Sequence, residues 1–255
     1  MIVLRMTVTP LQDAARHAYA LSIAATEDQV RAAQRLRHRV FCQEQGARPA
    51  TLLAGHDADP FDAAADHLIV TETATGDVVG TYRLLPPGRG GASYAGTEFD
   101  LGPLPAPVRA TMVEMGRACV APEHRTGAVV NLMWAGIARY ALLSGHRYLA
   151  GCASVPLAEG EAAATTALRF GEGGHAAPAA FRVRPRTPWT PSRVPDAAPR
   201  YPDLPPLLRA YLRLGAWICG APHHDPDFGT VDFFVLLDLD GVHERYRRHF
   251  LGEAR

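Results

Sequence analysis

The sequence predicts an α+β fold in which helices cover a central mixed, largely antiparallel, twisted sheet. Two apolar segments with strand character, residues 67–71 and 78–85, are separated only by a turn at residues 74–77. Segments joined by so short a turn are expected to pair as antiparallel strands. Helical patterns and further strand patterns follow, and 255 residues leave ample room for a core. The organisation predicted is a poorly determined leader over residues 1–25 and a single domain over 26–255.

The first helix is predicted to begin after Thr26, which can cap it, because Gln29 follows three residues later as in a capping box. The helical spacing then places four residues on one face. These are Val30, Ala33, Arg37 and Phe41.

The remaining elements are predicted from apolar periodicity and from the positions of glycine and proline. After the two strands named above they are a strand at 114–120, a helix at 129–144 that Gly145 ends, a strand at 148–154, a helix at 158–170, a helix at 207–217, a strand at 231–237 and a helix at 241–250. Residues 185–206 are dense in Pro and Arg and are expected to form a loop or insert.

Charged residues interrupt several of these apolar patterns. Arg37 lies in the apolar stripe of the first helix, Arg83 lies in an apolar strand, and Glu114 and Arg117 lie together in another strand. An uncompensated charge in such a place is costly, so a partner is expected. The loop that contains Asp57, Asp59 and Asp62 is the candidate partner. A polar network built into the core is therefore predicted, and such networks are often functional. The alternative for Arg37 is that its guanidinium reaches the solvent at the rim.

Composition excludes several classes of function. The 26 basic residues balance 26 acidic ones, which gives no sign of nucleic-acid binding. All 26 basic residues are Arg, so a phosphate-loop lysine and a lysine Schiff base are excluded. The four cysteines form no Cys-x-x-Cys pair, and no segment has the length and apolarity of a spanning helix or signal peptide. We expect a cytoplasmic protein with reduced thiols.

Several blocks, in this order, resemble the acyl-homoserine-lactone synthase branch of the GNAT acyltransferases. They are Leu36-Arg37-x-x-Val40-Phe41, Asp57-x-Asp59-x-Phe61-Asp62, Gly80-Thr81-Tyr82-Arg83-Leu84-Leu85-Pro86 and Glu114-x-Gly116-Arg117. The blocks at 98–101, 114–120, 148–154, 211–217 and 225–232 resemble the ornithine Nα-acyltransferases of ornithine-lipid synthesis. The resemblance extends over about residues 34 to 250.

The resemblance implies a GNAT-like α/β/α sandwich and N-acyl transfer from a thioester. It implies a 3-hydroxyacyl chain on acyl carrier protein as donor, the α-amine of ornithine as acceptor and a lyso-ornithine lipid as product. Other N-acyl amino acid synthases, a lactone-forming synthase and a non-catalytic module that binds lipid or carrier protein are the alternatives. The only cofactor chemistry expected is the acyl-phosphopantetheine of the donor, which coenzyme A could also supply. The lipid product could bring peripheral contact with the inner face of the membrane.

The donor phosphate is expected at the start of the helix after the third strand, because unpaired N–H groups there attract anions. The candidate residues are Arg125, Thr126, Gly127 and Ala128. His124 and Val129 depart from the family's basic and small residues at this loop. That departure favours a carrier protein, which presents a single phosphate. A plain glycine turn is the alternative.

The remaining roles are assigned to residues of the resembling blocks. Glu114 is the candidate general base, with Arg117 and Arg83 beside it as catalytic residues; Glu114 could instead pair with one of these arginines. Strict alternation separates Glu114 from Arg117, and a bulge at Gly116 could bring them to one side. Arg37, Asp57, Asp59 and Asp62 form the candidate substrate-binding cluster, in which the aspartates either bind an ammonium group or lock Arg37 and Arg83.

Phe41, Phe99 and Trp134 are candidates for an acyl pocket or are plain core. No metal site is expected, because the adjacent residues His223 and His224 are poorly suited to converge on one ion.

Overall fold

A computed structural model describes residues 18–89, 91, 93–125, 127–194 and 198–242. Its contacts divide the chain into two compact units. Unit 1 takes residues up to 90 and residues 115–145, and unit 2 takes residues 91–114 and 146–243. A single domain over 26–255 stays a prediction. No helix in the described residues is both long and apolar enough to cross a membrane.

Unit 1 contains strands in the order β1-β2-β3-β5. They are β1 (Tyr19–Ile23), β2 (Asp66–Glu72), β3 (Val78–Leu85) and β5 (Met112–Val120), of which the first three residues of β5 belong to unit 2. The antiparallel pairing of β2 with β3 is confirmed, and the turn between them uses Gly76 at φ 80°. β1 pairs with β2, so this part of the expected leader belongs to the fold.

Helix α2 (Glu27–Arg37) begins as predicted. The Thr26 hydroxyl accepts the Gln29 amide at 3.3 Å, and Gln29 Oε1 accepts the amide of Ala25 at 2.7 Å. The chain then continues as the π-helix η1 (His38–Glu44), in which the Gln45 amide donates to the Val40 carbonyl. Because a π-helix closes hydrogen bonds over five residues, the face of α2 does not continue at i+4. Val40 is buried, and Phe41 is half-buried like Val30 of the predicted face.

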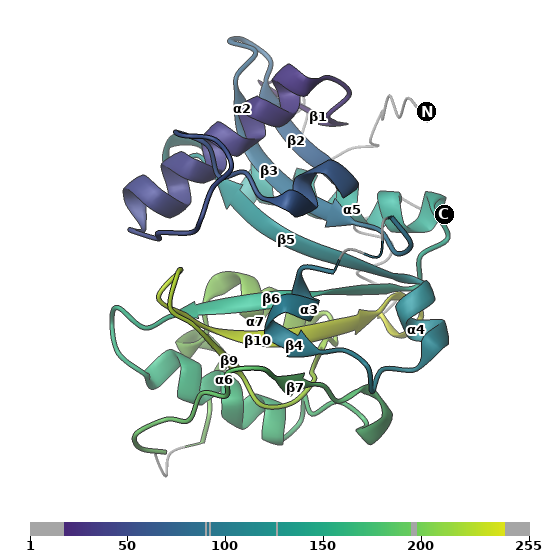
Figure 1. The fold of residues 1–255 in the computed structure, drawn as a ribbon, viewed down its shortest axis with the longest axis vertical. Helices are drawn as coiled ribbons and strands as arrows, with labels where there is room; N and C mark the ends of the chain where they lie inside the picture. Colours follow the sequence, from purple (N-terminus) through teal and green to yellow (C-terminus); the bar gives the residue numbers. More distant parts are fainter. Residues whose placement is uncertain (1–17, 90, 92, 126, 195–197, 243–255) are drawn as a thin grey trace. The chain divides into compact units, whose positions relative to one another are not determined.

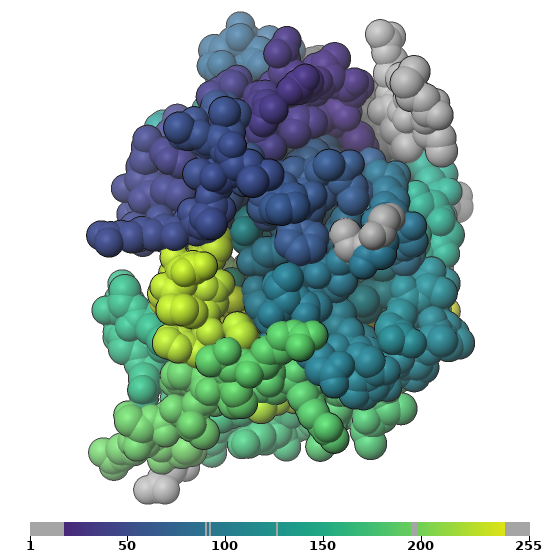
Figure 2. Space-filling model, in the orientation of Figure 1, coloured from purple at the N-terminus to yellow at the C-terminus, as the bar shows by residue number. Residues whose placement is uncertain are grey.

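Two helices cover opposite faces of the unit 1 strands (Figure 1). Helix α5 (Gly127–Leu143) packs closely on β3, since a Cβ at Gly80 would lie 2.9 Å from Val129 Cγ1. Alternation puts Arg83 on the other face of β3, the face toward α2. The short helices here are η2 (Pro60–Ala64) and η3 (Pro122–His124). In Figure 2 the purple and indigo side chains of α2 and the segment after it form the outer surface of this unit.

Unit 2 contains strands in the order β5-β6-β10-β8, with β9 also paired to β10. Their bounds are β6 (Tyr148–Pro156), β8 (Trp217–Ile218), β9 (His223–Asp225) and β10 (Thr230–Asp238). The start of β5 pairs with β6 in parallel, and β6 pairs with β10 antiparallel. A separate pair joins β4 (Phe99–Asp100) to β7 (Arg184–Pro185).

One face of β6 and β10 forms the core of unit 2. Ala150, Phe234 and Leu236 lie on it, under Ala95 and Phe99. The helices of this unit are α3 (Ala95–Glu98), α4 (Ala106–Ala110), α6 (Ala162–Glu172), α7 (Pro206–Arg213), η4 (Ala179–Phe181), η5 (Tyr201–Asp203) and η6 (Leu239–Gly241).

Predicted segments in the second half of the chain have different outcomes. The helix predicted over 207–217 ends at Arg213, because Gly215 adopts φ 98° and the chain turns into β8. The described residues of the segment 185–206 are largely irregular, as its proline content predicted. The helix predicted at 241–250 lies almost entirely outside the described residues.

Candidate active site

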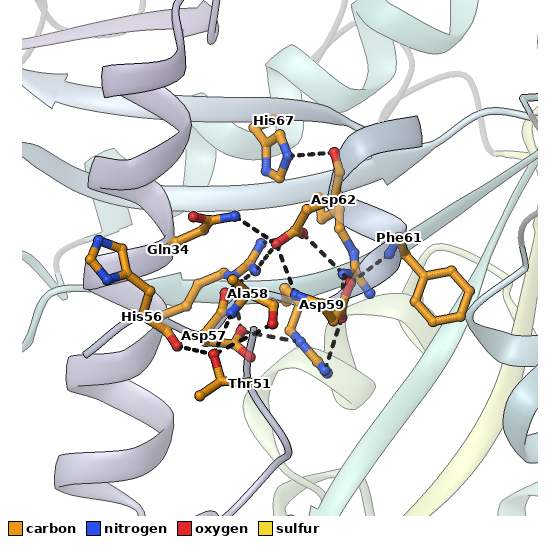
Figure 3. A network of polar contacts seen from close by, with 12 residues as sticks. Gln34, Thr51, His56, Asp57, Ala58, Asp59, Phe61, Asp62 and His67 are labelled. Atoms are coloured by element: carbon orange, nitrogen blue, oxygen red, sulfur yellow. Dashed lines mark hydrogen bonds and ion pairs between the residues drawn. The ribbon is translucent and has the colours of Figure 1, made fainter. Parts of the chain in front are cut away.

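Arg37 at the end of α2 is completely buried and meets the acidic loop. Its Nε lies 2.8 Å from Asp57 Oδ2, and its Nη2 lies 2.8 Å from Asp62 Oδ2. Nη2 also donates to the Asp57 carbonyl. Figure 3 shows the three aspartates of the loop gathered around these contacts. The alternative in which Arg37 reaches the solvent is therefore wrong.

Arg83 and Arg117 complete the cluster. Arg83 Nη1 lies 2.6 Å from Asp59 Oδ2 and 3.1 Å from Asp62 Oδ1. Arg117 Nε lies 3.2 Å from Asp57 Oδ2, and its Nη2 lies 3.3 Å from Asp59 Oδ2. The six side chains thus form a closed ring, in which each carboxylate contacts two arginines and each arginine contacts two carboxylates. The predicted network of three arginines on the acidic loop is confirmed.

The loop has its own local reasons to fold this way. Asp59 caps η2 by accepting the Phe61 amide at 2.9 Å, Pro60 occupies the first turn, and Asp62 accepts the Asp59 amide at 3.3 Å. Gln34 Nε2 donates to Asp62 Oδ2 at 2.8 Å. Each ring carboxylate is committed to internal partners, so the contacts favour the alternative in which the aspartates lock Arg37 and Arg83.

Charge neutralisation stabilises the ionised ring. Burial alone would raise the pKa of Asp62, but hydrogen bonds from Arg37 and the charges of Arg37 and Arg83 outweigh it and hold that pKa well below its usual range. Burial lowers the pKa of His67, whose Nε2 lies 3.2 Å from the Asp62 carbonyl. Sequence reasoning missed Gln34 and His67. A signal for Gln34 was present, since it lies next to Ala33 and three residues before Arg37.

Arg117 is the single residue other than glycine with positive φ in the described part of the chain, at 52°. This left-handed residue directly follows Gly116, and the bulge expected at Gly116 stays a prediction. An arginine in this conformation is strained, and its two ion pairs with Asp57 and Asp59 offset that cost. Strain of this kind is concentrated at functional sites.

Glu114 belongs to unit 2. It lies at the register position of Ala150 on β6, and its Oε2 accepts the backbone amide of Ala95 at 2.9 Å. The carboxyl group is half-buried. Its role as base stays a prediction.

A second acidic cluster, absent from the sequence-based predictions, lies in unit 2. One carboxyl oxygen from each of Glu98, Asp225 and Asp232 lies within 4.8 Å of the other two. Asp232 is an even-numbered residue of β10 like Phe234, so it faces the same side, and it is 2% exposed. Burial, with the charge of Asp232 next, raises the pKa of Glu98 to about 8. The signal was present, because Asp232 interrupts an apolar strand just as Arg83 does.

Cys152 lies beside this cluster. Burial, followed by the charges of Glu98 and Asp232, raises the pKa of its thiol. Glu114 contributes to the same shift. The base candidate and the acidic cluster therefore share one electrostatic environment on one face of the unit 2 strands.

The donor loop is only partly as expected. Arg125 makes a bidentate ion pair with Glu44, with both Nη–Oε distances 2.6 Å, and its Nε donates to the Val120 carbonyl. Gly127 and Ala128 form the first turn of α5, which contains no acidic side chain. Thr126 lies outside the described residues. The glycine of this loop begins α5, so a helix N-terminus lies where the phosphate was predicted.

The three candidate acyl-pocket residues differ in their surroundings. Phe99 is fully buried and packs on Phe234, with ring centroids 5.8 Å apart, so it is core in this structure. Trp134 is buried in α5, and Phe41 is half-buried in η1. An acyl pocket lined by these residues stays a prediction.

Comparison with known proteins connects these features. A model of the acetyltransferase (GNAT) domain matches residues 36–135, which include the whole arginine–aspartate ring and Glu114. Among solved structures, the AHL synthase LasI covers 93% of this chain and 98% of its own at TM-score 0.55 and 14% identity. TofI, solved in a ternary complex with an inhibitor and MTA, covers 93% of this chain and 97% of its own at TM-score 0.53 and 18% identity. These likenesses confirm the predicted GNAT fold.

Curated relatives extend over almost the full chain. The L-ornithine N(alpha)-acyltransferase of Brucella abortus is 34% identical over 257 residues, which cover 91% of this chain and 88% of the relative. The enzyme of the same name from Agrobacterium fabrum is 35% identical over 250 residues, 91% of this chain and 85% of the relative. The chain is therefore an N-acyltransferase that belongs to the L-ornithine N(alpha)-acyltransferase family.

Proposed function

We propose that this enzyme transfers a (3-hydroxy)fatty acyl group from acyl carrier protein to the α-amine of ornithine, giving a lyso-ornithine lipid. The observation that carries the proposal is the near full-length match to relatives named for ornithine Nα-acylation. The acidic cluster of Glu98, Asp225 and Asp232 in unit 2 adds support, because a diamino acid brings a positive side chain into its binding site.

The reaction joins the amine nitrogen to the thioester carbonyl carbon and breaks the C–S bond. The α-ammonium must first lose a proton, and the nitrogen loses a second one as the amide forms, while the departing thiolate gains a proton. Glu114 is the proposed base, because it is half-buried and its Oε2 is fixed by the Ala95 amide. Arg83 and Arg117 are proposed to supply positive charge for the developing oxyanion, and the ring holds both guanidinium groups in place.

The donor is proposed to bind at the start of α5. The helix dipole and unpaired N–H groups of Gly127 and Ala128 suit a phosphate of phosphopantetheine. Arg125 can add charge there once it exchanges Glu44 for the phosphate. The Arg125 side chain is 44% exposed, so a phosphate can reach it from the solvent.

The direct test is product analysis with purified protein. The enzyme is incubated with ornithine and a 3-hydroxyacyl chain on acyl carrier protein, and in parallel on coenzyme A. Tandem mass spectrometry of the product then locates the acyl group on the α- or δ-nitrogen. We expect acylation on the α-nitrogen. Wild-type protein that acylates other amino acids but never ornithine would contradict the proposal.

A further inference from the structure

We infer that Glu98, Asp225 and Asp232 form the binding site for the side-chain ammonium of the amino-acid substrate. The inference rests on the proposed function and deepens it, because it states how a diamino acid is oriented. An enzyme that acylates only the α-amine must keep the second amine away from the thioester. A site that sequesters the side-chain ammonium does this.

The first argument is an unmet polar group. Glu98 is only 5% exposed, and its Oε2 has no hydrogen-bond partner among the described residues. This oxygen belongs to a carboxyl group that lies within 4.8 Å of ligand oxygens of Asp225 and Asp232. A buried acceptor left unsatisfied is costly, so a donor is expected at this place.

The second argument is charge. In the ring of unit 1 three carboxylates meet three arginines, whereas no ion pair joins Glu98 or Asp225 to a basic side chain in the described structure. The Glu98 and Asp225 carboxyl groups, close together and without a basic partner among the described residues, favour a cationic ligand. An ammonium group brings one positive charge and three N–H donors, one for each carboxyl group.

The third argument is the position of the cluster relative to Glu114. Helix α3 begins at Ala95, whose amide donates to Glu114, and ends at Glu98. The carboxyl groups of Glu98 and Glu114 both act on the Cys152 thiol, so the cluster and the proposed base lie in one part of unit 2. This fits a substrate that presents its side-chain nitrogen to the cluster and its α-amine to Glu114.

The local structure keeps the cluster in shape. Asp225 Oδ1 accepts the amides of Asp227 and Phe228 at 2.9 and 3.2 Å, and the Thr230 hydroxyl donates to Asp232 Oδ1 at 3.2 Å. The carboxyl groups are thus held by backbone and hydroxyl donors. Each carboxyl group has further acceptor positions for an ammonium.

The test compares ornithine with 2-aminopentanoate, which has the same carbon chain but no side-chain amine. Glu98→Gln and Asp225→Asn should lower kcat/KM for ornithine by roughly 10–100-fold, as expected for the loss of a charged hydrogen bond in a buried site. Turnover of 2-aminopentanoate should stay equal or rise, which also shows that the variants are folded. Asp227→Asn is the matched control, since it removes an exposed charge from the same loop.

Other outcomes are distinguishable. Equal losses for both amino acids in the variants would overturn the ammonium site and leave the proposed function intact. Wild-type protein that acylates only 2-aminopentanoate would contradict the proposed function and the ammonium site with it. A thermal shift with Ca²⁺ or Mg²⁺ that Glu98→Gln abolishes, with unchanged preference for ornithine, would mean that the cluster is a metal site instead.

Discussion

The charge of Arg37 is compensated entirely by neighbouring protein groups, because no part of its side chain reaches the solvent. We predict that Arg37→Ala lowers the free energy of unfolding by about 3–5 kcal/mol, since it leaves buried carboxylates uncompensated. Urea denaturation measures this change. Arg200→Ala is the control, because Arg200 forms an exposed pair with Asp203 and should leave stability nearly unchanged. Equal midpoints for all three proteins would show that the ring does not stabilise the fold.

Glu114 is the residue on which the proposed chemistry depends. We predict that Glu114→Gln lowers kcat by roughly 10²–10⁴-fold, the usual contribution of general acid–base catalysis. The Gln side-chain oxygen can still accept the Ala95 amide, so the melting temperature should change little. Steady-state kinetics at saturating ornithine and donor tests this. A variant with nearly normal kcat would assign Glu114 a purely structural role.

Glu98 gives a pH-dependent stability of definite sign. Its pKa of about 8 in the folded protein exceeds the ordinary value of about 4.3, so the native state binds more protons between these values. Stability should therefore decrease with rising pH across this window, by up to about 1.4 kcal/mol per pH unit from this group. Asp62 acts oppositely, because its lowered pKa makes stability fall as acid is added below about pH 4.

Urea denaturation of wild type and Glu98→Gln at several pH values between 5 and 9 measures the effect. The difference between the two proteins should grow with pH in favour of the variant. Asp227→Asn removes an exposed charge nearby and should run parallel to wild type. Curves for Glu98→Gln that also run parallel to wild type would contradict a protonated Glu98.

The same kind of reasoning succeeded at Arg37 and failed at Asp232. A charge inside an apolar pattern demands a partner, and this argument predicted the contact between Arg37 and the acidic loop. Asp232 interrupts the apolar run 231–237 in the same way, but no partner is predicted for it from the sequence. Asp232 forms a cluster with Glu98, which lies 134 positions earlier in the sequence. No local sequence pattern connects the two residues, so the cluster could not be predicted.

At the scale of elements, the sequence predicts which helices and strands exist better than it predicts where they begin and end. β3 has the predicted bounds, because its apolar run lies between a tight turn and Pro86. The helix after Thr26 begins as predicted, but its change to the π-helix η1 carries no signal in the 3.6-residue period. β1 was missed for a tertiary reason, since its strand geometry depends on pairing with β2.

Close packing between α5 and β3 gives a prediction at this scale. A Cβ at Gly80 would lie 2.9 Å from Val129 Cγ1 and 3.2 Å from Met133 Sδ. Gly80→Val should therefore destabilise the protein by about 1–3 kcal/mol through overpacking. Gly116→Ala is the control, since no atom lies within 4 Å of a Cβ there. Equal melting temperatures for Gly80→Val and wild type would mean that α5 can shift away without cost.

For the whole molecule, the fold and family could be predicted because several blocks occur in one order along most of the chain. The division into two units could not be predicted, because its boundary falls inside the strand β5, between Glu114 and Met115. A boundary within a strand leaves no signal in the sequence pattern. The roles of the two acidic clusters differ for a similar reason. Sequence shows acids in both, but only tertiary contacts show that one cluster has arginine partners.

The choice between acyl carrier protein and coenzyme A as donor depends on the surface of the whole molecule, because a carrier protein is recognised by a surface. The molecule has no net charge, so steering must come from local arginines such as Arg125. We predict that acyl carrier protein donors exceed coenzyme A donors in kcat/KM at low ionic strength, and that this advantage shrinks as salt is added. Arg125→Glu should remove much of the advantage, since it sets a second acid beside Glu44.

The matched control for this experiment is Arg200→Glu, which makes the same charge change at an exposed site of unit 2. It should leave the ratio of carrier-protein to coenzyme A rates unchanged at each salt concentration. Coenzyme A rates should also change less with salt than carrier-protein rates, because a small donor buries fewer charged contacts. Identical use of both donors at every ionic strength, with Arg125→Glu neutral, would exclude surface recognition of a carrier protein. N-acyl transfer would then stand with coenzyme A as donor, and the start of α5 would bind its phosphates.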